Sequence, residues 1–370
     1  MKIPFLSFEG MHAPHRADIL AAMERVLDSG WFIMGQELTR FEQAFAQYTG
    51  VSDCVGVANG LDALHIALKT LGIGKGDEVI VPSNTYIASW LAVSQMGATP
   101  IPVEPNPETY NIDPARIEAA ISPRTKAIMP VHLYGQACEM EALMRIAKKH
   151  NLYVVEDNAQ AQGAAFAGKP TGSFGDINAT SFYPGKNLGA LGDAGGITTN
   201  SPEWARAVRT YRNCGSQQKY HNEEKGINSR LDELQAAVLS SKLPLLNTWN
   251  EERQALAAAY LQNLADVPEL ILPKTAQSAS HVYHLFVVRT EQRDALQAHL
   301  QKAGVGTLIH YPIPPHLQPA YSELGYKKGD FPLAESIAQT ALSLPLYPGL
   351  SAEALAYVCQ SIREFFQKTI

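Results

Sequence analysis

A single lysine stands in a stretch of the chain that is unusually rich in glycine. Residues 181–196 read SFYPGKNLGALGDAGG, with five glycines, one lysine at position 186 and one aspartate. Glycine weakens regular structure and is favoured where the chain turns tightly or lies close to a ligand. Two interpretations therefore compete: a mobile surface loop whose lysine is solvated, or a loop that holds Lys186 against a bound group.

The residues around Lys186 exclude two common phosphate-binding loops. A P-loop requires G-x-x-x-x-G-K-[ST], but Thr180 occupies the first glycine position and Asn187 the last position. No G-x-G-x-x-G opens a predicted helix, so the dinucleotide-binding fingerprint is absent as well. The remaining chemistry is that of a nucleophilic amine, which forms a Schiff base with a carbonyl. If that carbonyl belongs to pyridoxal phosphate, the chain must also supply a partner for the pyridine nitrogen, a stacking ring and a phosphate site.

Candidates for the first two parts follow predicted strands. Asp157 ends LYVVED, at the edge where ligands of open α/β sheets bind, and its carboxylate could keep the pyridine nitrogen protonated. A helix N-cap is an equally good interpretation of this aspartate on its own. Gln160 could donate to the phenolic oxygen of the ring. Tyr86, in PSNTYIAS, could stack on the ring, although a lone aromatic residue is more often part of the core.

The third part, a phosphate site, is indicated where a predicted strand passes into a helix. In NGLDAL, Gly60 and Leu61 begin the helix, and free backbone N–H groups at a helix N-terminus attract anions. An ordinary strand-to-helix turn is the more frequent explanation for such a segment taken alone. Ser181, five residues before Lys186, could add a hydroxyl donor.

Composition narrows the class of protein. The 370 residues are 46% hydrophobic and carry a formal net charge of -6, which argues against a nucleic-acid partner. The four cysteines are far apart and form no C-x-x-C pair, so no metal site is expected and the chain fits a reducing compartment. With no apolar leader and no run of 18 apolar residues, we expect a cytoplasmic protein without a membrane span.

Short apolar runs alternate with amphipathic stretches in the first half of the chain. This alternation predicts βαβ units and a parallel or mixed sheet covered by helices. The β-branched, continuously apolar character of the runs is typical of strands buried on both faces. The predicted strands lie at residues 53–58, 77–83, 98–104, 125–131 and 152–157.

The pattern changes after residue 230. Residues 231–264 are nearly all strong helix formers, interrupted at Pro244. A strand at 281–289, a helix through 291–303 and a final helix near 351–367 follow. We therefore predict a large α/β domain over 1–245, including two N-terminal helices, and a smaller α+β domain over 246–370.

Several of these motifs together resemble one family. They are NGLDAL, PSNTYIAS, VHLYGQ, VEDNAQAQGA, SFYPGKNLGALGDAGG and GINSRLDELQAAVL. The chain is similar in them to the DegT/StrS sugar aminotransferases, which are pyridoxal-phosphate enzymes. The resemblance implies the aspartate aminotransferase fold (fold type I), with a large mixed-sheet domain and a smaller C-terminal α+β domain.

The resemblance also implies a role for each matching position. Lys186 would be the catalytic lysine, binding the cofactor as a Schiff base and moving protons. The implied cofactor contacts are Gly60, Leu61, Tyr86, Asp157, Gln160 and Ser181, together with Asn228 from the partner subunit of a homodimer. The implied substrate contacts are Tyr183, Lys219, Tyr220, His310 and Tyr311.

The implied reaction moves the amino group of L-glutamate, which leaves as 2-oxoglutarate, to a nucleotide-linked keto sugar. The loop YPGKNLGALGD and residues 211–239 are similar to aminotransferases acting at the third carbon of dTDP-linked 6-deoxy sugars. The expected product is therefore a dTDP-3-amino-3,6-dideoxyhexose, a deoxyamino sugar of the kind found in lipopolysaccharide O-antigen. A UDP-linked 3-keto sugar acid and a 4-keto sugar are the alternative substrates. Related sugar dehydratases carry histidine at the lysine position, so Lys186 argues against a lyase, and the complete cofactor set argues against a non-catalytic regulator.

Overall fold

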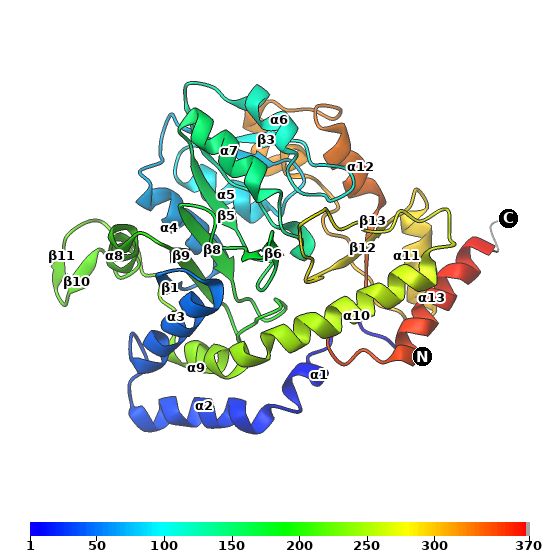
Figure 1. Cartoon of the computed structure of the whole chain (residues 1–370), viewed down its shortest axis with the longest axis horizontal. Helices are drawn as coiled ribbons and strands as arrows, with labels where there is room; N and C mark the ends of the chain where they lie inside the picture. The colour runs from blue at the N-terminus through cyan, green and yellow to red at the C-terminus, as the bar shows by residue number, and fades with distance from the viewer. Residues whose placement is uncertain (368–370) are drawn as a thin grey trace.

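The computed structural model describes residues 1–367 and has a seven-stranded mixed sheet at its centre (Figure 1). The strand order is β1-β9-β8-β5-β4-β2-β3, in which β9 runs antiparallel to both β1 and β8 and the other pairs are parallel. The strands are β1 (Asp53–Val57), β2 (Glu78–Pro82), β3 (Thr99–Val103), β4 (Thr125–Ile128), β5 (Tyr153–Asp157), β8 (Ile177–Ser181) and β9 (Gly195–Thr199). The predicted α/β class with a mixed sheet is confirmed.

Helices cover both faces of this sheet. On one face, α4 (Gly60–Thr70), α5 (Ile87–Gln95) and α8 (Pro202–Tyr211) share a core with strand residues such as Val79 and Val155. On the other face, α7 (Met140–His150) packs on Ile80 and Val154, and α3 (Gln36–Thr49) packs over Cys54. Neighbouring residues of one strand thus enter opposite cores, which explains why these strands are apolar throughout.

Two strands of the sheet were not predicted from the sequence. β8 reads INATS and β9 reads GGITT, so neither has the continuous apolar pattern of the other strands. A Cβ atom at Gly195 would lie 2.3 Å from the carbonyl oxygen of Asn59, so the backbone of β9 comes too close to the start of α4 for any other residue. Part of the glycine content near Lys186 therefore serves strand packing.

The C-terminal part of the chain lies beside the sheet and has its own core. Pro244 lies in a 3₁₀ turn (Leu243–Leu245) between α9 (Glu233–Lys242) and the long α10 (Leu246–Leu264), which crosses toward this part in Figure 1. The two-stranded sheet of β12 (Phe286–Arg289) and β13 (Ala341–Leu344) packs with α11 (Arg293–Lys302) and α13 (Ala352–Gln367). Ile3 joins the same core, so the first residues of the chain pack with its end. The division at residue 245 stays a prediction.

The remaining elements are short or peripheral. They are α1 (Glu9–His12), α2 (Arg16–Ser29), α6 (Pro114–Ile117), β6 (Ala165–Phe166), β7 (Lys169–Pro170), β10 (Ser216–Gln218), β11 (His221–Asn222), α12 (Pro332–Thr340) and four further 3₁₀ turns at 118–120, 133–135, 315–317 and 319–324. Among residues 1–367, no helix is long and apolar enough to cross a membrane. No cluster of three or more His, Cys, Asp or Glu side chains in that range is placed to hold a metal ion.

Candidate active site

A cavity of about 950 Å³ opens between the carboxyl ends of the central strands and the C-terminal part of the chain. Ten of the residues predicted from the sequence line it, although they come from segments up to 250 residues apart. They are Gly60, Leu61, Tyr86, Asp157, Gln160, Ser181, Tyr183, Lys186, His310 and Tyr311. The fold therefore assembles most of the predicted site within one chain.

Lys186 lies in the wall of this cavity and is half-buried. Its backbone N–H donates to the carbonyl of Tyr183 at 2.8 Å, which closes a tight turn at the start of the glycine-rich loop. Burial lowers the pKa of its ammonium group from 10.5 to about 8, and the negative charge of Asp157 opposes only part of that change. Free amine is therefore a much larger fraction of this group at pH 7 than of a solvated lysine. This environment suits a nucleophile and proton carrier better than a solvated surface lysine.

Asp157 ends β5 and is buried against the floor of the cavity. One carboxylate oxygen accepts the hydroxyl of Ser89 at 2.8 Å, and the other accepts the backbone N–H of Ala159 at 3.2 Å. No helix begins here, because residues 158–164 form turns and irregular backbone, so the helix-cap interpretation is wrong. Burial raises the pKa of the carboxyl, and no ion pair to Asp157 is present within residues 1–367. A cationic N–H group in the cavity would complete its surroundings.

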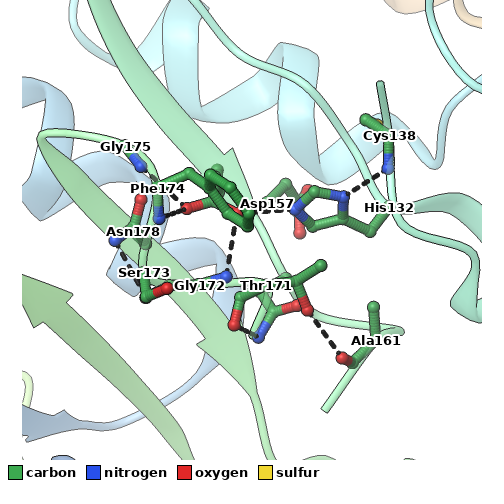
Figure 2. A network of polar contacts seen from close by, with 12 residues as sticks. His132, Cys138, Asp157, Ala161, Thr171, Gly172, Ser173, Phe174, Gly175 and Asn178 are labelled. Atoms are coloured by element: carbon green, nitrogen blue, oxygen red, sulfur yellow. Dashed lines mark hydrogen bonds and ion pairs between the residues drawn. The ribbon is translucent and has the colours of Figure 1, made fainter. Parts of the chain in front are cut away.

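Beneath Asp157, a buried network holds β5 in place (Figure 2). Glu156 accepts backbone N–H groups of Gly172, Phe174 and Gly175 at 2.6–2.8 Å and lies 2.8 Å from Nε2 of His132. Because Nδ1 of His132 accepts the backbone N–H of Cys138, the imidazole carries its proton on Nε2 and donates to Glu156. The backbone N–H of His132 in turn donates to the carbonyl of Asp157. These bonds leave the position of Asp157 little freedom.

The amide of Gln160 bridges two tyrosines at the cavity. Its Oε1 accepts the backbone N–H of Tyr134 at 2.6 Å, and its Nε2 donates to the hydroxyl of Tyr311 at 3.0 Å. Because the N–H of Tyr134 can only donate, the amide orientation is set and Nε2 faces the cavity side. The ring of Tyr86 lies 5.1 Å from that of Tyr311 and is 52% exposed, so its face is open to a ligand.

The predicted phosphate site lies where α4 meets the end of β8. The side chain of Asn59 caps the helix by accepting the N–H of Asp62 at 2.8 Å, and within the described residues the N–H groups of Gly60 and Leu61 donate no hydrogen bond. A Cβ atom at Gly60 would lie 2.6 Å from Cβ of Ser181, so only glycine allows this approach. Two free N–H groups and a hydroxyl at a helix N-terminus form an anion site.

Two predicted substrate residues, His310 and Tyr183, also line the cavity. His310 binds Oγ of Ser343 through Nδ1 at 2.8 Å, and burial lowers its pKa to about 4, so the ring is neutral at pH 7. Tyr183 lies at the opening with 57% of its surface exposed.

Three predicted residues lie outside the cavity. Asn228 is exposed and pairs with Asn213 through a backbone bridge. Lys219 and Tyr220 lie at the tip of the β10–β11 hairpin, which projects from the body of the chain (Figure 1). Tyr220 is 91% exposed, and the ammonium of Lys219 lies over its ring. Within one chain, these residues do not contribute to the site.

The sequence interpretation missed some residues of the cavity. Ser89, in α5, is fully buried beside the cavity, where its hydroxyl donates to Asp157 and lies 3.1 Å from the hydroxyl of Thr85. His284 and Phe5 line the cavity itself. Nothing in the local sequence indicated that Phe5 would lie at the cavity, because its position depends on the packing of the N-terminal segment against the C-terminal core.

The arrangement fits pyridoxal phosphate. Lys186 and Asp157 face one cavity without pairing, and an anion site lies at its edge. The amine of Lys186 can react with an aldehyde, and the carboxylate of Asp157 can accept a hydrogen bond from a ring N–H. The N-terminus of α4 can bind a phosphate.

Comparison with known proteins agrees with this chemistry. The DegT/DnrJ/EryC1/StrS aminotransferase family matches residues 14–363. A dTDP-3-amino-3,6-dideoxy-alpha-D-galactopyranose transaminase of Aneurinibacillus thermoaerophilus is 53% identical over 363 residues, which cover 98% of this chain and 99% of that protein. The crystal structure of DesV from S. venezuelae is 52% identical with a TM-score of 0.97 and covers 98% of each chain. NtdA from Bacillus subtilis, solved with bound cofactor PMP, is 34% identical with a TM-score of 0.93, covering 99% of this chain and 85% of that one. The chain belongs to the DegT/DnrJ/EryC1/StrS aminotransferase family and is a pyridoxal-phosphate-dependent transaminase.

Proposed function

We propose that this enzyme transfers the amino group of L-glutamate to dTDP-3-keto-6-deoxyhexose, giving dTDP-3-amino-3,6-dideoxyhexose and 2-oxoglutarate. The observation that carries the proposal is the lysine of lowered pKa that faces an unpaired buried carboxylate across one cavity. The relative from A. thermoaerophilus, named for a 3-amino-3,6-dideoxy sugar, supports the choice of the third carbon.

Different residues of the cavity would bind different parts of the cofactor. Asp157 would keep the pyridine nitrogen protonated, Gln160 would donate to the phenolic oxygen, and the ring of Tyr86 would lie on the cofactor ring. The N–H groups of Gly60 and Leu61 and the hydroxyl of Ser181 would bind the phosphate. When bound, pyridoxal phosphate supplies an electron sink for the carbon that loses its proton.

Lys186 carries the proton chemistry in both halves of the reaction. In the glutamate half, its amine would take the proton from the α-carbon of the amino donor and pass it to the aldehyde carbon of the cofactor. In the sugar half, it would move a proton from that cofactor carbon to the sugar carbon, and both transfers require a pKa near the working pH. Tyr183, His310 and Tyr311 would contact the sugar, because they line the same cavity and the resemblance to the family gives them this role. The neutral imidazole of His310 and the tyrosine hydroxyls can bond sugar oxygens.

A homodimer would complete the site. Asn228, Lys219 and Tyr220 lie outside their own chain's cavity, although the resemblance to the family gives them roles in it. Four consecutive apolar residues, Trp31 to Met34, are each more than a third exposed, and they lie beside the segment that leads into α9. Burying such a patch against a second copy is favourable. The partner's copy of Asn228 would then reach the phosphate.

We expect two inactive variants to restore each other's activity when mixed. Lys186→Ala removes the amine from one cavity, and Asn228→Asp places a negative charge near the phosphate of the other subunit's cavity. A mixed dimer contains one site with both residues intact, so random exchange should recover up to about a quarter of wild-type activity, since half of the dimers are mixed and each has one of two sites intact. The measurement is glutamate-dependent amination after subunit exchange verified by mass spectrometry. Full exchange without recovery would place Asn228 in the site of its own chain.

The substrate is tested with a panel of keto sugars. The purified enzyme should be yellow and lose that colour with L-glutamate, and mass spectrometry should then find amination of dTDP-3-keto-6-deoxyhexose. We expect the 4-keto isomer to react at least 100-fold more slowly, because a misplaced sugar leaves buried polar groups unpaired. Amination of only the 4-keto compound, or of only a UDP-linked 3-keto sugar acid, would replace the proposed substrate but not the transaminase chemistry.

A further inference from the structure

A second lysine is buried beneath the glycine-rich loop that carries Lys186. Lys242 is the last residue of α9 and is 1% exposed, and within residues 1–367 no carboxylate bonds its ammonium group. Burying an ion costs several kcal/mol unless its surroundings compensate. Burial lowers the pKa of this ammonium to about 8. An aliphatic side chain would fill the same space without that cost, so packing alone does not explain why this residue is a lysine.

The groups around the ammonium of Lys242 are neutral: a backbone carbonyl, an imidazole nitrogen and an aromatic ring. Nζ donates to the carbonyl oxygen of Gly189 and lies 3.2 Å from Nε2 of His12. The ammonium has no lone pair, so Nε2 of His12 is the acceptor and the imidazole proton is on Nδ1. The ring of Trp249 lies 5.8 Å away, within the range of a cation–π contact. Together these groups form a site for a protonated lysine.

The hydrogen bond from Lys242 to the carbonyl of Gly189 connects α9 to the glycine-rich loop that carries Lys186. A Cβ atom at Gly189 would lie 2.2 Å from the carbonyl oxygen of Pro184, so the two ends of the loop touch. The N–H of Ala190 donates to the carbonyl of Phe182 at 2.8 Å, which closes the loop around Lys186. Because the loop is closed and packed on itself, a displacement of Gly189 is transmitted to Pro184 and to Lys186 two residues later.

We infer that Lys242 is a positioning residue: its ammonium group holds the Gly189 carbonyl and so sets where the amine of Lys186 stands relative to Asp157. This inference rests on the proposed role of Lys186. The hydrogen bonds of Asn187 to Asn250 and Val282, at 2.7 and 3.1 Å, fix the other side of the loop. Lys242 supplies the restraint from the α9 side, where Gly189 has no side chain of its own to anchor it.

The test compares Lys242→Met, which keeps length and loses the donor, with Arg289→Met. Arg289 is also a buried cation that bonds neutral hydroxyl oxygens, those of Thr340 and Ser336, but it lies in the C-terminal sheet away from the loop. We expect Lys242→Met to shift the pH midpoint of the bound cofactor's visible absorbance by at least about half a unit. We expect its kcat to fall about 10- to 100-fold at unchanged KM for glutamate, since small misplacements of a reacting group have effects of this size. Arg289→Met should lose thermal stability but keep the wild-type absorbance midpoint and the wild-type kcat.

A second variant keeps the test decisive if Lys242→Met does not fold. His12→Phe removes one acceptor of Lys242 and can keep the ring stack with Phe8, whose centroid lies 5.3 Å from that of His12. Its absorbance midpoint should shift in the same direction as that of Lys242→Met, and by less. Midpoints equal to wild type in the folded variants would show that Lys242 only stabilises the fold. The absorbance titration needs no sugar substrate, so a wild-type enzyme that binds the cofactor but aminates no sugar would overturn the proposed function and leave this result standing.

Discussion

Replacing Lys186 with alanine should abolish transamination while the protein remains folded. We expect a loss of at least about 1,000-fold in the rate of the glutamate half-reaction, because the variant lacks the group that moves the proton. The backbone turn at this position depends on the N–H of residue 186, which alanine keeps, so the loop should retain its shape. The measurement is the single-turnover change in cofactor absorbance on adding L-glutamate, with circular dichroism and thermal melting to verify the fold.

Lys186→Arg is the matched control for this result. Arginine keeps a positive charge near Asp157, but its guanidinium is protonated at all relevant pH values and is not a nucleophile. An equally inactive Lys186→Arg would show that the free amine, rather than the charge, is required. Normal turnover by Lys186→Ala would refute the proposed mechanism.

The second large effect is expected from Asp157→Asn. The amide matches the carboxylate in shape, and its oxygen can still accept the N–H of Ala159, so the fold should be kept. The variant cannot hold a protonated pyridine nitrogen, and we expect kcat to fall about 100-fold or more, as at other sites that lose one electrostatic group. The measurement is kcat for amination together with the affinity for pyridoxal phosphate, which should change much less than kcat.

Ser89→Ala provides the control for Asp157. It removes one hydrogen bond to the carboxylate and leaves the charge, a loss of about 1.5 kcal/mol, or roughly tenfold. A larger effect of Asp157→Asn than of Ser89→Ala would assign the catalytic contribution to the negative charge. Equal and small effects in both variants would indicate that Asp157 only orders the end of β5.

Much of the fold was predictable because its signals are local. The five predicted strands are continuous apolar runs that enter a core on each face, and all five appear in the sheet. Pro244 marked the break between two long helices for an equally local reason, because proline cannot continue the hydrogen-bond ladder of a helix. β8 and β9 escaped prediction because their polar and glycine residues are stabilised by pairing within the sheet, which for β9 includes β1, more than 100 residues earlier in the chain.

Short segments of the sequence likewise indicated the chemistry of the site. Lys186, Asp157 and the turn at Gly60 each stand directly after a strand or in the loop that leaves one, and the carboxyl ends of neighbouring strands meet at one edge. Residue types, their places after predicted strands and the family motifs were therefore enough to predict most of the groups that line the cavity.

Contacts between distant segments could be found only in the folded chain. The pKa of Lys186 near 8 follows from its burial, which no local pattern records. In the sequence, Lys242 is one more polar residue on a long helix, and its bond to Gly189, 53 residues earlier, exists only because α9 packs under the loop. Asn228 and Tyr220 matched the family as readily as Asp157 did, yet the tertiary structure puts them outside the cavity of their own chain. Local patterns specify which chemical groups are present, whereas packing decides which of them meet and how far burial alters their charge.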